Sequence, residues 1–188
     1  MLFQKLLVRI AAALSKRKIP YMVIGGQAVL RYGEPRATKD IDITLGLGPE
    51  DIQRVLAALS TAKLRCLVLD PEDFARTTMV VPARDDATGI RVDFILSFSD
   101  YERKALERAE NVAIGRSMVR FASLEDLVIH KMIAGRPRDL EDIESILLKN
   151  AEYDTKYIVS WLRAFDFSLE TDYTTRFRSL ARSVRTRR

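Results

Sequence analysis

Two aspartates, Asp40 and Asp42, stand one residue apart in a segment that alternates strictly between polar and apolar residues. This alternation predicts a strand over 40–45, and side chains at positions i and i+2 leave the same face of a strand. The two carboxylates are therefore expected on one face, about 6–7 Å apart at Cα. Like charges held that close need a counterion, and Mg²⁺ is the natural one because it takes carboxylate and phosphate oxygens.

Asp93 is a third acidic residue in the middle of an alternating segment, 91–96. If this strand lies beside 40–45, the three carboxylates converge, as in a two-metal site for phosphoryl or nucleotidyl transfer. In such a site one ion activates the attacking hydroxyl and the other holds the triphosphate, while Asp93 accepts or orients the proton of the nucleophile. The alternative is that these acids form the solvated outer face of an antiparallel sheet.

Gly25 and Gly26 follow a short apolar run, 21–24, and precede a predicted helix over 27–32. Glycines at the start of a helix let a phosphate approach backbone N–H groups, and the helix N-terminus adds a partial positive charge. A tight turn explains two glycines equally well. The order of strand, Gly-Gly, short helix, loop and acidic strand favours a nucleotide site.

The elements that must position these residues follow from hydrophobic period, capping residues and prolines. Helices are predicted over 2–16, 27–32, 49–60, 123–134, 137–149, 154–165 and 170–184. Strands are predicted over 21–24, 40–45, 64–69, 77–81 and 91–96, with a turn at 85–89 and a hairpin over 111–121. This order predicts an α+β fold, a mixed β-sheet flanked by helices with a helical C-terminal part.

The 188 residues, 47% apolar and 30% charged, suit one globular core with a small helical appendage. We expect a core over 1–122 and a helical C-terminal region over 123–188. One Cys and one His exclude a disulfide framework, a cysteine zinc site and a His-rich metal site. No apolar stretch is long enough for a transmembrane helix, so a cytoplasmic protein without a membrane partner is expected.

The net charge of +5 comes from the end of the chain. Residues 176–188 hold six Arg and no acidic residue, and without them 25 basic residues stand against 26 acidic ones. Such a basic tail is typical of contact with phosphates. A solubilising helix end is the alternative.

These motifs resemble the nucleotidyltransferase superfamily that includes DNA polymerase beta. Its pattern is a Gly-Gly or Gly-Ser turn, a D-x-D pair ten or more residues later, and a third Asp on a later strand. More narrowly, the R-x-T-x-D-I-D segment from Arg36 and the segment 130–143 (HKMIAGRPRDLEDI) resemble the AbiEii-type toxin nucleotidyltransferases. These are the enzymatic halves of bacterial abortive-infection and toxin–antitoxin pairs. The resemblance covers about residues 1–145 and implies a nucleotidyltransferase-like sheet.

The resemblance also implies site residues. The metal-binding and catalytic residues would be Asp40, Asp42 and Asp93, and the nucleotide-binding residues Gly25, Gly26, Gln27, Arg36, Lys131 and Asp139. Gln27 stands where a small hydroxyl residue is common in the family. Asp139, with Asp142, would orient Lys131 or a substrate group, and Arg36 would contact phosphate or brace its loop. The plainer alternatives are a surface lysine at Lys131 and a solvated helix start at Asp139 and Asp142.

The implied activity is Mg²⁺-dependent transfer of a nucleoside monophosphate from an NTP to a hydroxyl, with release of pyrophosphate. A toxin-type enzyme would use an RNA end such as the tRNA 3′ terminus, hold the RNA through the Arg-rich tail, and have a cognate antitoxin or toxin protein as partner. One alternative is a small-molecule nucleotidyltransferase that modifies antibiotics, for which Asp85, Asp86 and Asp100 offer charge to a polycationic acceptor. Another is a non-catalytic antitoxin or partner module.

Overall fold

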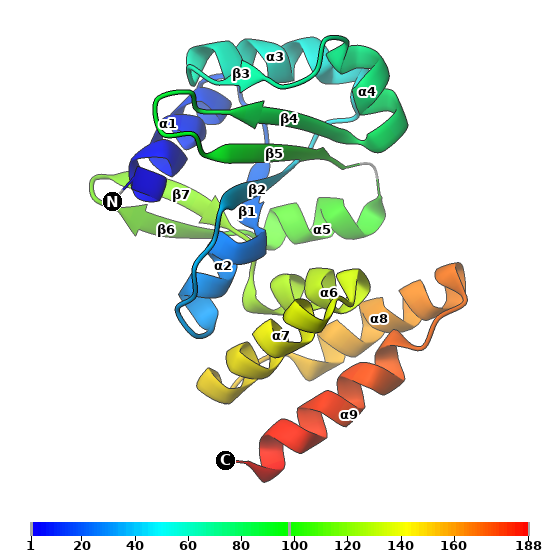
Figure 1. Cartoon of the computed structure of the whole chain (residues 1–188). Helices are drawn as coiled ribbons and strands as arrows, with labels where there is room; N and C mark the ends of the chain where they lie inside the picture. Colours follow the sequence, from blue (N-terminus) through cyan, green and yellow to red (C-terminus); the bar gives the residue numbers. More distant parts are fainter. Residues whose placement is uncertain (1, 98, 188) are drawn as a thin grey trace. The chain divides into compact units, whose positions relative to one another are not determined.

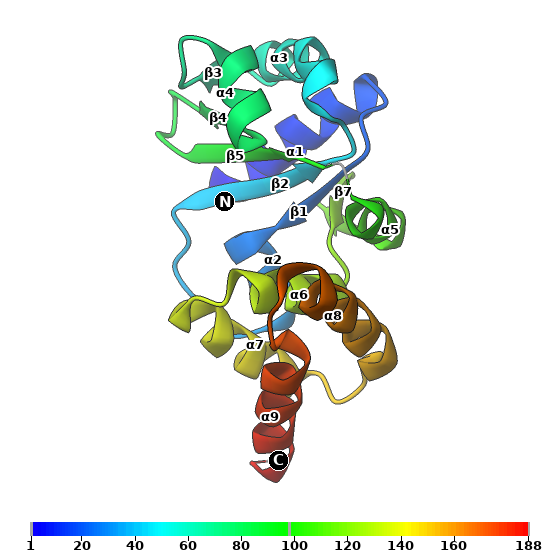
Figure 2. The same cartoon turned by 90° about the vertical axis from the view of Figure 1, so that its right-hand side faces the viewer.

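The computed structural model describes residues 2–97 and 99–187. Their contacts divide the chain into two units (Figures 1 and 2). The first unit comprises Met1–Gln27 and Thr38–Ala122, and the second comprises Ala28–Ala37 and Ser123–Arg188. In the described ranges, no helix is long and apolar enough to cross a membrane.

Within the described residues, the first unit is built on a seven-stranded mixed sheet in the order β3-β4-β5-β2-β1-β7-β6. The strands are β1 (Tyr21–Ile24), β2 (Asp40–Leu45), β3 (Arg65–Cys66), β4 (Val80–Arg84), β5 (Arg91–Leu96), β6 (Glu110–Ile114) and β7 (Ser117–Phe121). Strand β2 is parallel to β5 and antiparallel to β1, which in turn is parallel to β7. The alternating pattern of β2 and β5 buries Ile41, Ile43, Phe94 and Leu96, which are at most 1% exposed.

Four helices of the described residues lie wholly in the first unit, and two of them begin with a side-chain cap. They are α1 (Leu2–Lys16), α3 (Ile52–Thr61), which follows the 3₁₀ turn η1 (Pro49–Asp51), α4 (Pro71–Thr78) and α5 (Asp100–Arg108). The Asp70 side chain accepts a hydrogen bond from Asp73 N, which fixes the start of α4. Ser99 and Glu102 form a capping box at the start of α5.

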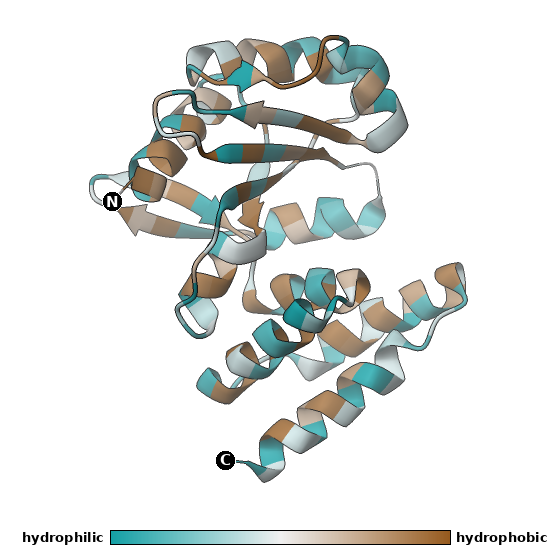
Figure 3. Ribbon diagram, in the orientation of Figure 1, coloured by the Kyte–Doolittle hydropathy of each residue, from teal (hydrophilic) through white to brown (hydrophobic). Residues whose placement is uncertain are grey.

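Four helices make up most of the second unit: α6 (Leu124–Ala134), α7 (Pro137–Lys149), α8 (Thr155–Leu169) and α9 (Tyr173–Thr186). Helix α2 (Gly25–Tyr32) begins with residues of the first unit and continues into those of the second. Hydrophobic and hydrophilic residues alternate along α9 (Figure 3), and Phe177, Ala181 and Val184 form its buried face. Residues 176–187 are therefore no free tail, because most of them belong to this packed amphipathic helix.

The predicted α+β class, a mixed sheet flanked by helices, is confirmed. Three element predictions are wrong in extent or type. The expected strand 77–81 begins only at Val80, because Thr77 and Thr78 end α4, and the expected strand 64–69 is reduced to Arg65–Cys66. Helix α2 begins at Gly25, so both glycines lie in its first turn.

Candidate active site

Asp42 and Asp93 occupy matching positions on neighbouring strands. Strands β2 and β5 are parallel, with Asp42 paired to Asp93 and Asp40 paired to Arg91. Residues in register on strands about 4.8 Å apart leave the same face of a sheet, and Asp40 shares that face with Asp42. All three aspartates are half-buried, while the residues between them are buried. The strand of Asp93 thus lies beside that of Asp40 and Asp42, as the acidic pattern required.

Arg91 is a cation on this acidic face. Its Nε donates to Asp93 Oδ1 at 2.9 Å and to Oδ2 at 3.0 Å. In the described residues, 2–97 and 99–187, no group of three or more His, Cys, Asp and Glu side chains is arranged to hold a metal ion. The register brings the three aspartates onto one face, and a metal site shared by them stays a prediction. The spacing of the acids along the sequence predicted their shared face. It did not predict that Arg91, two residues before Asp93 and on the same face, binds Asp93.

The chemistry of the donors nevertheless fits Mg²⁺. Carboxylate oxygens are hard ligands, and Mg²⁺ is commonly bound by one or two carboxylates together with substrate phosphates rather than by an all-protein cage. Asp40 and Asp42 would supply the protein ligands. Asp93, whose carboxylate accepts from Arg91 Nε, has lone pairs left with which it could join them.

Gly25 brings backbone directly against this acidic face. Its φ is +62°, and a Cβ at this position would overlap Asp42 Oδ2. Both the left-handed conformation and the close approach therefore require glycine. Gly26, next in the chain, is buried in the same first turn of α2. The junction of β1 and α2 thus places a helix N-terminus beside the Asp42 carboxylate, in the arrangement that suits a phosphate.

The side chain of Gln27 makes a hydrogen bond inside the protein. Its side chain is 8% exposed, and Nε2 donates to Thr38 Oγ1 at 2.6 Å. This hydrogen bond ties the start of α2 to the segment that leads into β2. Thr38 is a residue that sequence reasoning missed as a partner, because the pairing spans a loop with no regular spacing.

The remaining predicted residues form a buried ionic network in the second unit. Lys131 Nζ lies 2.7 Å from Asp139 Oδ1 and 2.8 Å from Asp142 Oδ2. Arg36 binds both oxygens of Asp142, through Nε at 2.8 Å and Nη2 at 2.9 Å. Arg136 Nε binds Asp139 Oδ2 at 2.8 Å. Three cations thus surround two carboxylates.

Burial decides between the alternative roles of this network. The side chains of Lys131, Asp139 and Asp142 are 7%, 5% and 4% exposed. The alternatives of a surface lysine and a solvated helix start are therefore wrong. Lys131 Nζ lies between Asp139 and Asp142, and Arg36 ties its own loop to α7 by binding Asp142.

Electrostatics keep Asp139 ionised. Burial raises the pKa of Asp139, but hydrogen bonds and charge from Lys131 and Arg136 outweigh it, so its pKa lies below the ordinary range. Arg136 was not predicted as a site residue, although its spacing of three from Asp139 at a helix start is a signal that could have found it.

The predicted site residues fall into two groups, one in each unit. The first unit holds Gly25, Gly26, Gln27, Asp40, Asp42 and Asp93, and the second holds Arg36, Lys131 and Asp139. A family model described as a nucleotidyltransferase of unknown function (DUF6036) matches residues 3–181. The chain belongs to this family. It is accordingly a nucleotidyltransferase, an enzyme whose α+β fold carries the acidic face just described.

Solved structures share this nucleotidyltransferase fold. The crystal structure of ANT(2″)-Ia with adenylyl-2″-tobramycin is 20% identical and has a TM-score of 0.53, over 100% of this chain and 99% of that one. The lincomycin-bound lincosamide adenylyltransferase LnuA is 17% identical, with a TM-score of 0.52, over 76% and 94%. An antigenic nucleotidyltransferase-like protein from Paracoccidioides brasiliensis is 18% identical, with a TM-score of 0.51, over 77% and 74%. No curated protein matches the sequence.

Proposed function

We propose that this nucleotidyltransferase transfers a nucleoside monophosphate from an NTP to a hydroxyl group, with Mg²⁺ as cofactor. The register of Asp42 and Asp93, with the backbone of Gly25 against Asp42, is the observation that carries the proposal. In the reaction the acceptor oxygen forms a bond to the α-phosphorus of the NTP. The bond from that phosphorus to the bridging oxygen breaks, and pyrophosphate leaves with the electron pair.

The residues of the first unit have separate roles in this reaction. Asp40 and Asp42 hold the cofactor, which when bound neutralises charge on the triphosphate and the attacking oxygen. Backbone N–H groups at Gly25 and Gly26 receive phosphate oxygens at the start of α2. The proton of the acceptor hydroxyl passes to an Asp93 carboxylate oxygen, and Arg91 orients that carboxylate in the absence of substrate.

An RNA end is the acceptor that we propose, in an enzyme of the AbiEii toxin type. The resemblance of the segments around Arg36 and Lys131 supports this assignment, as does the concentration of arginine in α9. An enzyme of this type would act in the cytoplasm and be restrained by a cognate antitoxin.

A small antibiotic is the second candidate acceptor. Its support is that the fold of ANT(2″)-Ia, solved with adenylyl-2″-tobramycin, is matched along nearly its whole length. The acids that could have received a polycationic drug are already engaged. Asp85 binds Arg9, Asp100 binds Arg103, and Asp86 Oδ1 lies 2.8 Å from Arg65 Nη2.

The test combines purified protein, Mg²⁺, each of four α-labelled NTPs and total bacterial RNA. Wild type should label RNA, and Asp42→Asn should lower the rate by about a hundredfold or more, because even residues that only support metal ligands cost 10–100-fold when removed. The control is Asp86→Asn, which removes a charge of the same sign from a surface ion pair and should leave the rate unchanged.

The other outcomes separate the candidates. Release of pyrophosphate without labelled RNA would overturn the RNA acceptor, and a panel of aminoglycosides and lincosamides would then identify a drug acceptor. If no NTP is turned over and none binds with Mg²⁺, the enzymatic proposal fails in favour of a non-catalytic partner module.

A further inference from the structure

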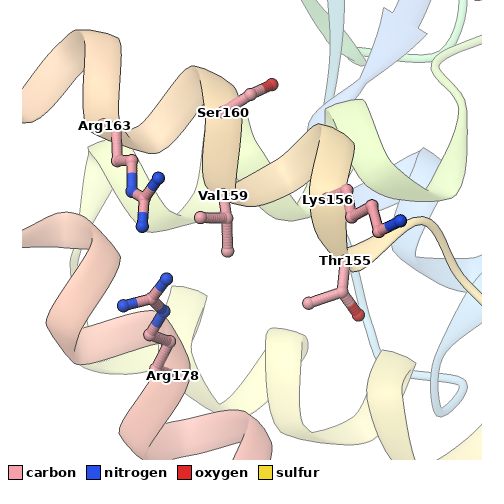
Figure 4. A pocket seen from close by; sticks show the side chains of 6 residues that line it. All are labelled: Thr155, Lys156, Val159, Ser160, Arg163 and Arg178. Carbon is pink, nitrogen blue, oxygen red and sulfur yellow. The ribbon is translucent and has the colours of Figure 1, made fainter.

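A basic pocket lies between α8 and α9 in the second unit. It has a volume of about 350 Å³ and is lined by Thr155, Lys156, Val159, Ser160, Arg163 and Arg178 (Figure 4). Three of the six side chains are cations and none is an acid. The guanidinium groups of Arg163 and Arg178 point toward one another from facing helices.

These cations differ from three other arginines of the unit. Arg36, Arg136 and Arg187 each bind a carboxylate at 2.8–2.9 Å. In the described part of the chain, no acidic side chain pairs with Lys156, Arg163 or Arg178, and all three are exposed. Unpaired cations that share a concave surface repel one another, so the pocket favours an anion.

Two acidic residues of this helical pair serve as helix caps. Asp154 Oδ1 accepts a hydrogen bond from Tyr157 N at 2.9 Å and begins α8. Asp166 accepts from Thr174 N at 3.1 Å, and its pKa is lowered because these hydrogen bonds outweigh burial. The carboxylates thus stabilise helix ends, and none of them lines the pocket.

The spacing of the cations indicates a chain of phosphates rather than one. Lys156 and Arg163 lie seven residues apart on α8, two turns of one helix face. Arg178 and Arg185 are also seven residues apart, on α9, and Arg182 lies between them on the same helix face. The basic surface therefore continues for about 10 Å beyond Arg178, at 1.5 Å per residue. A single inorganic phosphate would use only part of this row.

The pocket itself has room for one nucleotide of such a phosphate chain. Its volume falls in the range of about 300–1,000 Å³ that is usual for small ligands, which leaves room for a nucleotide. Val159 provides an apolar floor to the pocket. Arginine forks bind phosphate oxygens in pairs, whereas Lys156 supplies a point charge.

We propose that a basic groove, made of the pocket residues Lys156, Arg163 and Arg178 and continued along α9 by Arg182 and Arg185, binds the phosphodiester backbone of single-stranded RNA. The inference deepens the proposed function, on which its choice of RNA rests. It assigns to the helical unit the task of holding the acceptor.

The experiment measures binding and needs no turnover. A fluorescein-labelled single-stranded RNA of twelve nucleotides is titrated with the full chain at several salt concentrations, and anisotropy is read. The double variant Arg163→Gln/Arg178→Gln should weaken binding at least tenfold. It should also reduce the slope of log K against log salt by about 1.4, since each phosphate contact to a single strand contributes about 0.7.

The matched control is Arg76→Gln/Arg116→Gln, which removes the same charge from two exposed arginines of the first unit. It should bind RNA within twofold of wild type. Equal losses in both double variants would overturn the groove in favour of bulk charge, and so would unchanged binding in Arg163→Gln/Arg178→Gln. Displacement of the RNA by inorganic phosphate as readily as by unlabelled RNA, at equal phosphate concentration, would overturn the RNA assignment.

Asp42→Asn separates this inference from the proposed function. This variant should bind the labelled RNA as wild type does even though its rate of nucleotide transfer falls about a hundredfold or more. If wild type proves to modify only a small molecule while the arginine variants still lose RNA binding, the groove stands and the proposed acceptor fails. If Arg163→Gln/Arg178→Gln both binds and labels RNA as wild type does, the groove fails and the proposed function stands.

Discussion

Asp42 on β2 and Asp93 on β5 are register partners on adjacent parallel strands, and Arg91 holds the carboxylate of Asp93 from two residues away. The same register places Arg91 opposite Asp40. A cation thus stands within the acidic face and offsets part of the repulsion among its carboxylates. Any divalent ion that binds here competes with the positive charge of Arg91.

Arg91→Gln should therefore raise the affinity of the protein for Mn²⁺, used as a spectroscopic substitute for Mg²⁺. The expected gain is about two- to fivefold, because Arg91 is half-exposed and exposed ion pairs contribute at most about 1 kcal/mol. Titration followed by electron paramagnetic resonance measures the change. Arg65→Gln, which frees Asp86 in the same way, is the control. Weaker Mn²⁺ binding in Arg91→Gln would mean instead that Arg91 positions Asp93 as a ligand.

Gly25→Ala should impair nucleotide transfer through the Asp42 carboxylate. Gly89 offers a matched comparison, because both glycines have positive φ but a Cβ on Gly89 meets nothing within 4 Å. Gly89→Ala should lose about 1–2 kcal/mol of stability in urea unfolding, the cost of a left-handed alanine, and Gly25→Ala at least as much, because its Cβ also displaces the Asp42 side chain. Only Gly25→Ala should also lose tenfold or more of the transfer rate. Equal rates in the two variants would contradict a role for the close approach to Asp42.

Lys131→Met should destabilise the second unit strongly. The substitution removes the cation shared by Asp139 and Asp142, both buried, and breaking a buried ion pair in this way costs about 3–5 kcal/mol. Lys104→Met removes the cation of an exposed pair with Glu107 and should cost no more than about 1 kcal/mol. Urea unfolding at pH 7 measures both. A loss below 1 kcal/mol for Lys131→Met would show that the two arginines suffice to hold the network.

Asp139→Asn should make stability less sensitive to acid. Because the folded-state pKa of Asp139 is lowered, its carboxylate stabilises the protein above the unfolded-state pKa of about 3.9. This contribution is lost as the pH falls through the lowered folded-state pKa. At pH 7 the variant should be less stable by about 2–3 kcal/mol, the worth of hydrogen bonds to a charged group. Unfolding curves should show this gap shrinking between pH 5 and pH 3. A gap that stays constant over that range would contradict the assignment.

The sequence allowed the acidic strands to be predicted because their side-chain alternation is local. Ile41 and Ile43 alternate with Asp40 and Asp42, and a period of two is visible in any such segment. The pairing of Asp42 with Asp93 was not visible in the same way. It depends on which strands become neighbours and in which register, and a shift of one residue would send Asp93 to the opposite face.

Two helices were missed although local signals existed. Asp70 and Pro71 mark the start of α4, but the β-branched Thr77 and Thr78 favoured a strand at its end. Ser99 and Glu102 form the capping box of α5 in a segment for which no element was predicted. The ionic partners of Lys131 could be predicted only as a possibility, since Arg36 and Asp142 meet through tertiary packing and not through spacing.

The route of the chain between its two units constrains the order in which the protein folds during synthesis. Residues 28–37 belong with 123–188, and their partners there include Asp142 for Arg36 and Asn150, whose Nδ2 donates to Tyr32 O at 2.8 Å. The ribosome makes residues 28–37 long before those partners exist. This short segment must therefore wait for its partners while the strands of the sheet are made, and the helical unit can be completed only after those later helices have been made.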